Sequence, residues 1–315
     1  MDSNFLIMHY IQIRSPWQRL FLFIGLVLLF SLLFALLGLL IGKWYFDVSL
    51  MELAQMVSHP TSLQEISFLR FYQFFNQIGV FFLPAFALMF FTSGSVWREL
   101  KLNKPPYSVA VVITIIIVYA QLPFNGWLTS INESMQFPAS LSGLEDWMKE
   151  KELQANTLIE TILSTHSTSV LLLNLLIVAL MPALGEELFF RGVILKLFRE
   201  ITKNLHWAVI ISALLFSAFH FQFYGFLPRF VMGLVLGYLY VFTQNLWIPI
   251  IMHFVNNASS VLLFYFHYNG MISTPMEDFG STQNVVYIIG SGMMVVWLMI
   301  MLYQRLGADR VIKKF

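Results

Sequence analysis

Eight apolar stretches constrain the fold of this chain, because each is long enough to cross a lipid bilayer. A transmembrane helix needs about 20 mostly apolar residues. The expected spans are residues 20–42, 72–92, 107–124, 169–188, 207–223, 228–243, 247–267 and 284–303. Only 11% of the 315 residues are charged, against about 25% in a soluble domain. The sequence therefore predicts an all-α, polytopic membrane protein that folds as a single domain over residues 1–315.

The charges of the loops predict the orientation of the chain. Lys and Arg gather in both tails and in the loops after the second and fourth spans, whereas the loops after the third and seventh spans are acidic or neutral. Cytoplasmic loops carry the excess of Lys and Arg. With eight crossings the basic segments fall on one side, so we expect both termini in the cytoplasm and the protein in the plasma membrane. For the short span 228–243, a re-entrant loop is the alternative.

Composition narrows the kinds of partner and site. The formal net charge of +1 gives no overall field that would attract nucleic acid. Cysteine is absent, so the chain has no thiol nucleophile and no Cys-based metal site. The motifs of zincins, phosphate-binding loops and serine hydrolases are absent from the sequence as well. The lipid bilayer is the partner that the composition indicates.

Ionisable residues inside the apolar spans indicate a functional site. Charged groups in a span are rare, face a protein interior or a wet cavity, and usually mark function. The positions concerned, on three successive parts of the chain, are Glu186, Glu187, Arg191, His220, His253 and Asn257. Since the spans around them hold few other charges, we expect these side chains to share one buried site among the fourth to seventh spans.

Helical spacing separates the roles of the two adjacent glutamates. Residues four apart share a helix face, so Glu187 and Arg191 can form an ion pair, while Glu186 points about 100° away. An unpaired carboxylate in a medium of low polarity is suited to act as a general base. If the chain turns back near Lys203, His220 comes level with Glu186, and a water molecule fits between them. The alternative is that the charged residues only pin the helix.

The polar residues of the seventh span suit the stabilisation of negative charge. His253 and Asn257 are four residues apart and can both donate hydrogen bonds to one point, as a developing oxyanion requires. The alternative is that they join neighbouring helices by hydrogen bonds. Counting residues along the spans leaves His253 about 10 Å deeper than His220, a gap that the sequence does not close.

Two further features are expected to be structural. Residues 144–163 have good helix formers and an apolar stripe, so we predict a helix on the outer face, with Ser142 as its N-cap. Gly233 and Gly237 form a GxxxG pattern in the sixth span and predict a close helix contact.

Three ordered motifs resemble those of a known family. They are Glu186-Glu187-Leu188-Phe189-Phe190-Arg191 (EExxxR), Phe216-Ser217-Ala218-Phe219-His220 (FxxxH) and His253-Phe254-Val255-Asn256-Asn257 (HxxxN). In this order on apolar spans, they resemble the CPBP family, also called Abi, of intramembrane proteases related to the CAAX prenyl endopeptidase. The resemblance covers a core of about residues 169–260.

The resemblance implies an endopeptidase that hydrolyses a peptide bond of a peptide or protein substrate. Glu186 and His220 would activate the attacking water, and His253 and Asn257 would form the oxyanion hole. The supporting residues would be Glu187, Arg191 and Phe216. It also implies that no metal cofactor is needed, although a Glu with two His could bind zinc. Two functions without proteolysis stay open from the sequence: a non-catalytic immunity or scaffold protein of the same fold, and a proton-coupled transporter.

Overall fold

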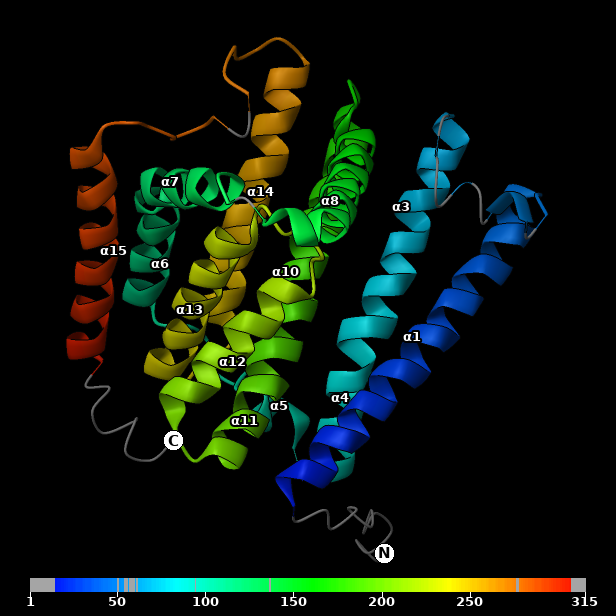
Figure 1. Ribbon diagram of the computed structural model, residues 1–315. Coiled ribbons are helices and arrows are strands. Elements are labelled where there is room, and N and C mark those ends of the chain that lie inside the picture. Colours follow the sequence, from blue (N-terminus) through cyan, green and yellow to red (C-terminus); the bar gives the residue numbers. More distant parts are fainter. Residues whose placement is uncertain are drawn as a thin grey trace, which may run out of the picture.

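The computed structural model is a helical bundle in which most helices run roughly along one axis (Figure 1). It describes residues 15–49, 51–53, 56, 60, 62–93, 95–135, 137–275 and 278–306. The elements are α1 (Pro16–Phe46), α3 (Leu63–Gln77), η1 (Ile78–Phe82), α4 (Leu83–Thr92), α5 (Val96–Glu99), α6 (Ser108–Ala120), α7 (Leu122–Glu133), η2 (Ala139–Leu141), α8 (Ser142–Leu163), α9 (Thr168–Asn174), η3 (Leu175–Leu180), α10 (Met181–Glu187), η4 (Leu188–Ile194), α11 (Leu195–Thr202), α12 (Leu205–Ala218), α13 (Phe226–Thr243), α14 (Trp247–Tyr268) and α15 (Val285–Arg305). No strand occurs among the residues described, which confirms the all-α prediction.

Six helical segments are long and apolar enough to cross a membrane. They are Pro16–Phe46, Leu63–Thr92, Thr168–Thr202, Phe226–Thr243, Trp247–Tyr268 and Val285–Arg305. The pair α6–α7 makes a seventh if its 45° bend lies within one span. Helix α12 has 14 residues, which reach about 21 Å and fall short of a hydrocarbon core of about 30 Å. Thus the described chain supplies six or seven full-length spans where eight were expected, and α13 is a continuous helix rather than a re-entrant loop.

Proline accounts for the irregular turns within these spans. It lacks the N–H that would bond to the carbonyl four residues earlier. Pro84 and Pro182 each follow a π-helical segment that contains the residue four positions earlier, Val80 or Val178. Pro123 stands near the start of α7, where the chain bends by 45°. Helix α10, which carries the two glutamates, therefore enters from a π-helical segment and leaves through another, η4.

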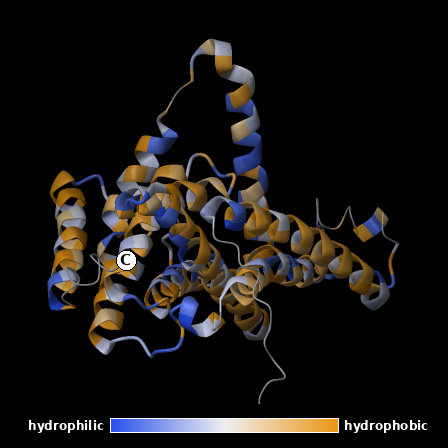
Figure 2. Cartoon of the chain, turned by 90° about the horizontal axis from the view of Figure 1, so that it is seen from below, coloured by the Kyte–Doolittle hydropathy of each residue, from blue (hydrophilic) through white to orange (hydrophobic). Residues whose placement is uncertain are grey.

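The bundle surface is apolar, as a lipid-facing surface should be. Helices α1 and α15 expose large apolar side chains such as Leu28, Leu32, Val286 and Met293, and Figure 2 shows hydrophobic residues over most of the bundle. The outer ends of α1 and α15, where the described chain begins and ends, lie at one edge together with α5 and α11 (Figure 1).

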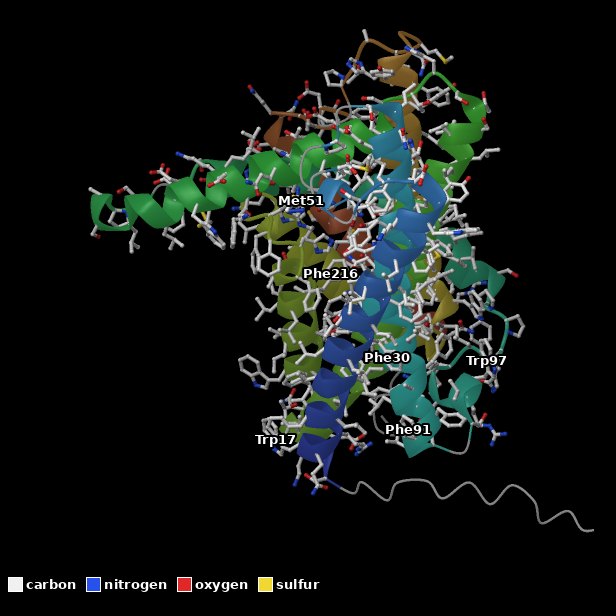
Figure 3. The ribbon with its side chains drawn as sticks, turned by 90° about the vertical axis from the view of Figure 1, so that its right-hand side faces the viewer. Trp17, Phe30, Met51, Phe91, Trp97 and Phe216 are labelled. Atoms are coloured by element: carbon white, nitrogen blue, oxygen red, sulfur yellow. The ribbon has the colours of Figure 1, made fainter. Side chains whose placement is uncertain are left out.

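Helix α8 departs from the common axis. It projects sideways from the bundle (Figure 3) and carries mixed polar and apolar residues (Figure 2). This is the outer helix predicted over residues 144–163, but the predicted cap is wrong. Ser142 is the first helical residue, and the N-cap position is Leu141, which makes no side-chain cap bond. The reason is that a short 3-10 turn, η2, leads directly into α8.

Candidate active site

Helix α10 places the adjacent glutamates in different surroundings. Glu187 is fully buried, and its Oε1 accepts a hydrogen bond from Nη1 of Arg191 at 2.7 Å. The same oxygen lies 2.9 Å from Nδ1 of His253 on α14. The ion pair expected from the four-residue spacing is present, and π-helical turns in η4 carry Arg191. The contact between Glu187 and His253 was not predicted, because it depends on how α10 and α14 are rotated against each other.

Arg191 connects three helices at the base of the site. Its Nη2 donates to the carbonyl oxygen of Gly233 on α13 at 2.9 Å. Its guanidinium carbon lies 4.8 Å from the ring centroid of Phe216 on α12, a cation–π contact. A Cβ on Gly233 would come within 3.0 Å of Ala213, so glycine allows the close approach of α12 and α13 that the GxxxG pattern predicted. Sequence reasoning missed the carbonyl, because a backbone acceptor leaves no signal in a motif.

Glu186 is the centre on which the two histidines converge. Its Oε2 lies 3.9 Å from Nε2 of His220 and 4.0 Å from Nε2 of His253. That oxygen is buried and has no hydrogen-bond partner among the described residues. Separations near 4 Å are too long for a hydrogen bond, and a contact of this length between polar atoms suits a bridging water. The structure therefore brings together Glu186, His220 and His253, which the sequence placed on three separate segments.

Hydrogen bonds at Nδ1 define which nitrogen of each ring faces Glu186. Nδ1 of His220 lies 2.9 Å from the carbonyl oxygen of Phe216, and this oxygen can only accept. Nδ1 of His253 faces Oε1 of Glu187, which already accepts from Arg191. Both Nδ1 atoms must therefore carry the proton, so in a neutral ring the Nε2 lone pair points toward Glu186.

His220 lies beyond the helix that was expected to carry it. Helix α12 ends at Ala218, and the chain turns back through Phe221, whose φ is +52°. The depth gap predicted between His220 and His253 is wrong, since both rings reach the same oxygen of Glu186. A depth count by residue number assumes that all spans are parallel, whereas α12 and α13 run obliquely to α14 in Figure 1.

Phe216 and Asn257 are the remaining residues that the sequence predicted for the site. The Phe216 ring lies 5.2 Å from that of His220 and 5.7 Å from that of His253, so it packs against both as well as Arg191. Figure 3 shows it in the interior of the bundle. Asn257 stands one turn after His253 and is half-buried. Its Oδ1 accepts from the Asn256 amide at 3.3 Å, and no described residue accepts from its own NH₂ group.

The charges of the cluster balance if one histidine is protonated. Glu186 and Glu187 carry two negative charges as carboxylates, and Arg191 carries one positive charge. A net charge in a buried site is costly. A protonated His253, held against the Glu187 carboxylate, would make the cluster neutral and would present its Nε2–H on the side of Glu186.

The side chains do not fit a zinc site. In the described part of the chain, no group of three or more His, Asp or Glu is placed so as to hold a metal ion. Bonds from zinc to nitrogen and oxygen ligands measure about 2.0–2.2 Å, which calls for a tighter cluster than Glu186, His220 and His253 make. The expectation that the reaction needs no cofactor stays a prediction.

The segment that carries all three motifs is similar to known proteins. Residues 168–259 match the family described as Type II CAAX prenyl endopeptidase Rce1-like. A stretch of 91 residues is 29% identical to the protein of Bacillus subtilis (strain 168) named "Putative membrane peptidase YdiL". It covers 29% of this chain and 37% of that relative, so the match spans little more than a third of the relative's length. No solved structure matches the chain significantly.

Proposed function

We propose, from the match of residues 168–259 to the CAAX prenyl endopeptidase Rce1-like family, that the chain is an intramembrane endopeptidase. It hydrolyses a peptide bond with a water molecule activated by Glu186 and His220. The observation that carries the proposal is the buried, unpartnered Oε2 of Glu186, within about 4 Å of Nε2 of two histidines on two other segments of the described chain. Among the described residues, no hydrogen bond accounts for the burial of that oxygen.

The first step uses the lone pairs of Glu186 Oε2 and His220 Nε2. A water between Glu186 Oε2 and His220 Nε2 donates a hydrogen bond to each, which directs its own lone pair outward. The side chain of His220 is 30% exposed and that of Glu186 is 10% exposed, so a peptide carbonyl approaches from the His220 side. As the water attacks the carbonyl carbon, its proton passes to Glu186, the general base. The proton then moves to the leaving amine as the C–N bond breaks.

The second part of the site stabilises the tetrahedral intermediate. The oxyanion accepts from Nε2–H of a protonated His253 and from the NH₂ group of Asn257. Glu187 keeps Nδ1 of His253 protonated and holds the positive charge, and Arg191 holds Glu187 in place. Fixed donors aimed at the developing charge are usually the largest contribution to such a reaction.

The proposed substrate is a peptide segment of a protein, cut at the level of the membrane. The family is named for CAAX prenyl endopeptidases, whereas the contacts of the site bear on the peptide bond alone. The protein lies in the plasma membrane with both termini in the cytoplasm. In support, α1 begins and α15 ends at one edge of the bundle (Figure 1), and loop charge is basic at both tails.

The test measures cleavage of a fluorogenic peptide library by the purified protein in nanodiscs. We expect Glu186→Gln and His220→Ala each to lower the cleavage rate by about 10²–10⁴-fold, the range of general acid–base catalysis. Glu160→Gln and His166→Ala, which change exposed residues of the same types outside the site, serve as matched controls and should cleave at the wild-type rate.

Three outcomes would contradict the proposal. Wild-type cleavage by both Glu186→Gln and His220→Ala would remove the proposed general base. Loss of wild-type activity on adding a chelator, with recovery on adding zinc, would replace the glutamate mechanism by a metal-dependent one. Absence of cleavage by wild-type protein of any peptide in the library would favour a non-catalytic role for the fold.

A further inference from the structure

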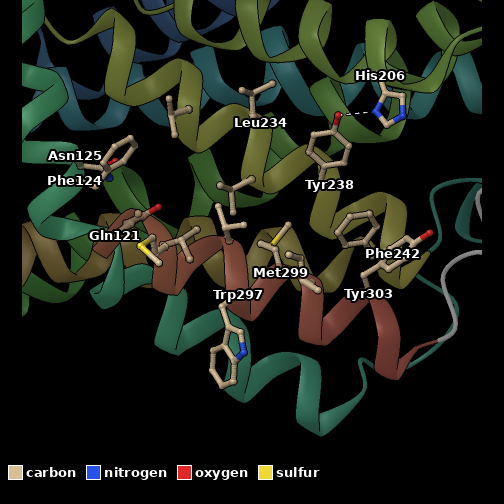
Figure 4. Close-up of a pocket in the computed structure, with 17 residues that line it drawn as sticks. Gln121, Phe124, Asn125, His206, Leu234, Tyr238, Phe242, Trp297, Met299 and Tyr303 are labelled. Atoms are coloured by element: carbon tan, nitrogen blue, oxygen red, sulfur yellow. Dashed lines mark hydrogen bonds between the residues drawn. The ribbon is translucent and has the colours of Figure 1, made fainter. Parts of the chain in front are cut away.

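A second cavity lies on the side of α13 that faces away from the active site. It has a volume of about 790 Å³ and runs between α13 and α15 (Figure 4). This is the size of a small-molecule site. Its walls are apolar, with Leu234, Val235, Val296 and Met299 among them. On the α15 side, Val296 and Trp297 are each 57% exposed, so the cavity opens toward lipid.

The two ends of this groove differ in their polar groups. At one end, Nδ1 of His206 and the hydroxyl of Tyr238 are bonded to each other at 2.8 Å (Figure 4). At the other end lie Gln121 and Asn125, one helical turn apart at the bend between α6 and α7. Gln121 is only 2% exposed. Its Nε2 and the Oδ1 of Asn125 are buried and have no partner in the described part of the chain.

Such orphaned groups indicate what the groove holds. A buried polar atom without a hydrogen bond is costly, so each needs a partner. One is a donor and the other an acceptor, and a single hydroxyl group satisfies both. We propose that the groove binds a long-chain lipid alcohol, whose hydroxyl donates to Asn125 Oδ1 and accepts from Gln121 Nε2. Its hydrocarbon chain lies between α13 and α15, toward the His206–Tyr238 end.

Shape and charge agree with this occupant. From Val231 to Phe242, the wall on α13 spans twelve residues, or about 16 Å, which suits an extended chain rather than a compact ring system. Among the described residues, the lining contains no Asp, Glu, Lys or Arg that would neutralise a charged headgroup. His206 and Tyr238 already bond to each other, so the lipid hydroxyl should bind at the Gln121–Asn125 end. The hydrocarbon chain of the lipid then has one preferred direction in the groove.

The experiment uses the intact protein in nanodiscs and a photoreactive probe, a C12 primary alcohol with a mid-chain diazirine. Labelled peptides are identified by mass spectrometry, with 1-dodecanol or dodecane as competitor. We expect labels on α13 and α15, and displacement about tenfold more effective with dodecanol than with dodecane, as for one or two buried hydrogen bonds. In Gln121→Leu and Asn125→Leu the two competitors should become nearly equal.

Controls separate this site from bulk lipid. Gln154→Leu, an exposed substitution on α8, should keep the preference for the alcohol. Equal displacement by both competitors in the wild type, or labels spread equally over lipid-facing helices such as α1, would overturn the proposal. The wild-type comparison is decisive even if the variants at the bend fail to fold. Because the readout is labelling rather than cleavage, it stands apart from the test of the protease.

Discussion

Two buried arginines within the bundle differ in how fully the polar groups around them are hydrogen-bonded. Arg70 on α3 is 7% exposed and Arg191 is fully buried. Nε of Arg70 donates to Oδ1 of Asn174 at 2.9 Å, and its Nη2 donates to the carbonyl of Ile162 at the end of α8. The Asn174 amide donates to the same carbonyl at 2.9 Å. Neither Arg70 nor Asn174 has a buried side-chain atom without a partner in the described structure.

The Arg191 cluster is incomplete by comparison. Oε2 of Glu186, Oε2 of Glu187 and Nε of Arg191 are all buried without a partner among the described residues. The positive charge of Arg70 faces the negative end of the α8 dipole. The buried side-chain groups of Arg70 and Asn174 all have partners in the described structure. A polar network with unfilled hydrogen bonds awaits water or a ligand, whereas a filled one holds helices together. This contrast, rather than burial of charge alone, distinguishes the candidate active site from the cluster that anchors α8.

Separate changes of the two neighbouring glutamates test this contrast most strongly. Glu187→Gln leaves Arg191 and His253 without their carboxylate, so we expect the unfolding free energy to fall by about 3–5 kcal/mol. Glu186→Gln removes an unpartnered carboxylate, so stability should stay the same or rise. Unfolding in mixed micelles with increasing SDS measures both. Equal losses of stability would show that Glu186 is as firmly paired as Glu187.

Each cluster has an asparagine, so the same substitution can be compared in both. Asn257→Ala should lower kcat by about 10²–10³-fold, the effect of removing one oxyanion donor, with little change in stability. Asn174→Ala should lower the unfolding free energy with little change in kcat, because the hydrogen bonds of Asn174 connect α9 to the end of α8. Cleavage kinetics and SDS unfolding on the same preparations decide the matter. A near-normal kcat for Asn257→Ala would assign this residue to helix packing.

How much the sequence could predict differs between the two clusters. Spacing alone gave the Glu187–Arg191 pair, and Lys203 does adopt the left-handed turn that ends α11. The motifs marked His220 and His253, but no local pattern could show that α12 stops before His220 or that His253 contacts Glu187. Those features depend on helix length, rotation and tilt, which packing of the whole bundle sets.

The Arg70 cluster lay beyond sequence reasoning altogether. Arg70 and Asn174 are separated by 104 residues and belong to no motif. An arginine near the start of an apolar span reads as a residue at the membrane surface. Only its acceptors, an amide and a helix-terminal carbonyl, reveal a structural role. Local patterns therefore identify chemistry that recurs in motifs, and they miss contacts that are particular to one fold.

Arg70→Met should have a smaller effect than the change at Glu187. It removes the charged hydrogen bonds to Asn174 and Ile162, so we expect a loss of about 1.5–3 kcal/mol in unfolding free energy. Faster hydrogen exchange should appear at the C-terminal turn of α8. Cleavage should fall much less than in Asn257→Ala, since no atom of Arg70 takes part in the site. A loss of cleavage as large as that in Asn257→Ala would join the two clusters into one functional unit.

The smallest effect is expected from an ion pair at the surface near the N-terminal end of α8. The side-chain hydrogen bond to Lys149 lowers the pKa of Glu145 from its ordinary value of 4.5, and the same bond raises the pKa of Lys149 above 10.5. The pair therefore stabilises α8 fully between these ordinary values. Its contribution is lost as the pH falls from 4.5 through the lowered pKa of Glu145. Hydrogen exchange of α8, corrected for intrinsic rates, should be slightly faster in Glu145→Gln than in the wild type at pH 7, and the difference should shrink at acid pH. Since the pair lies at the surface, it should leave the Arg70 anchor and the cleavage rate unchanged. A change in either would show that the projecting part of α8 is coupled to the bundle more tightly than the two buried clusters imply.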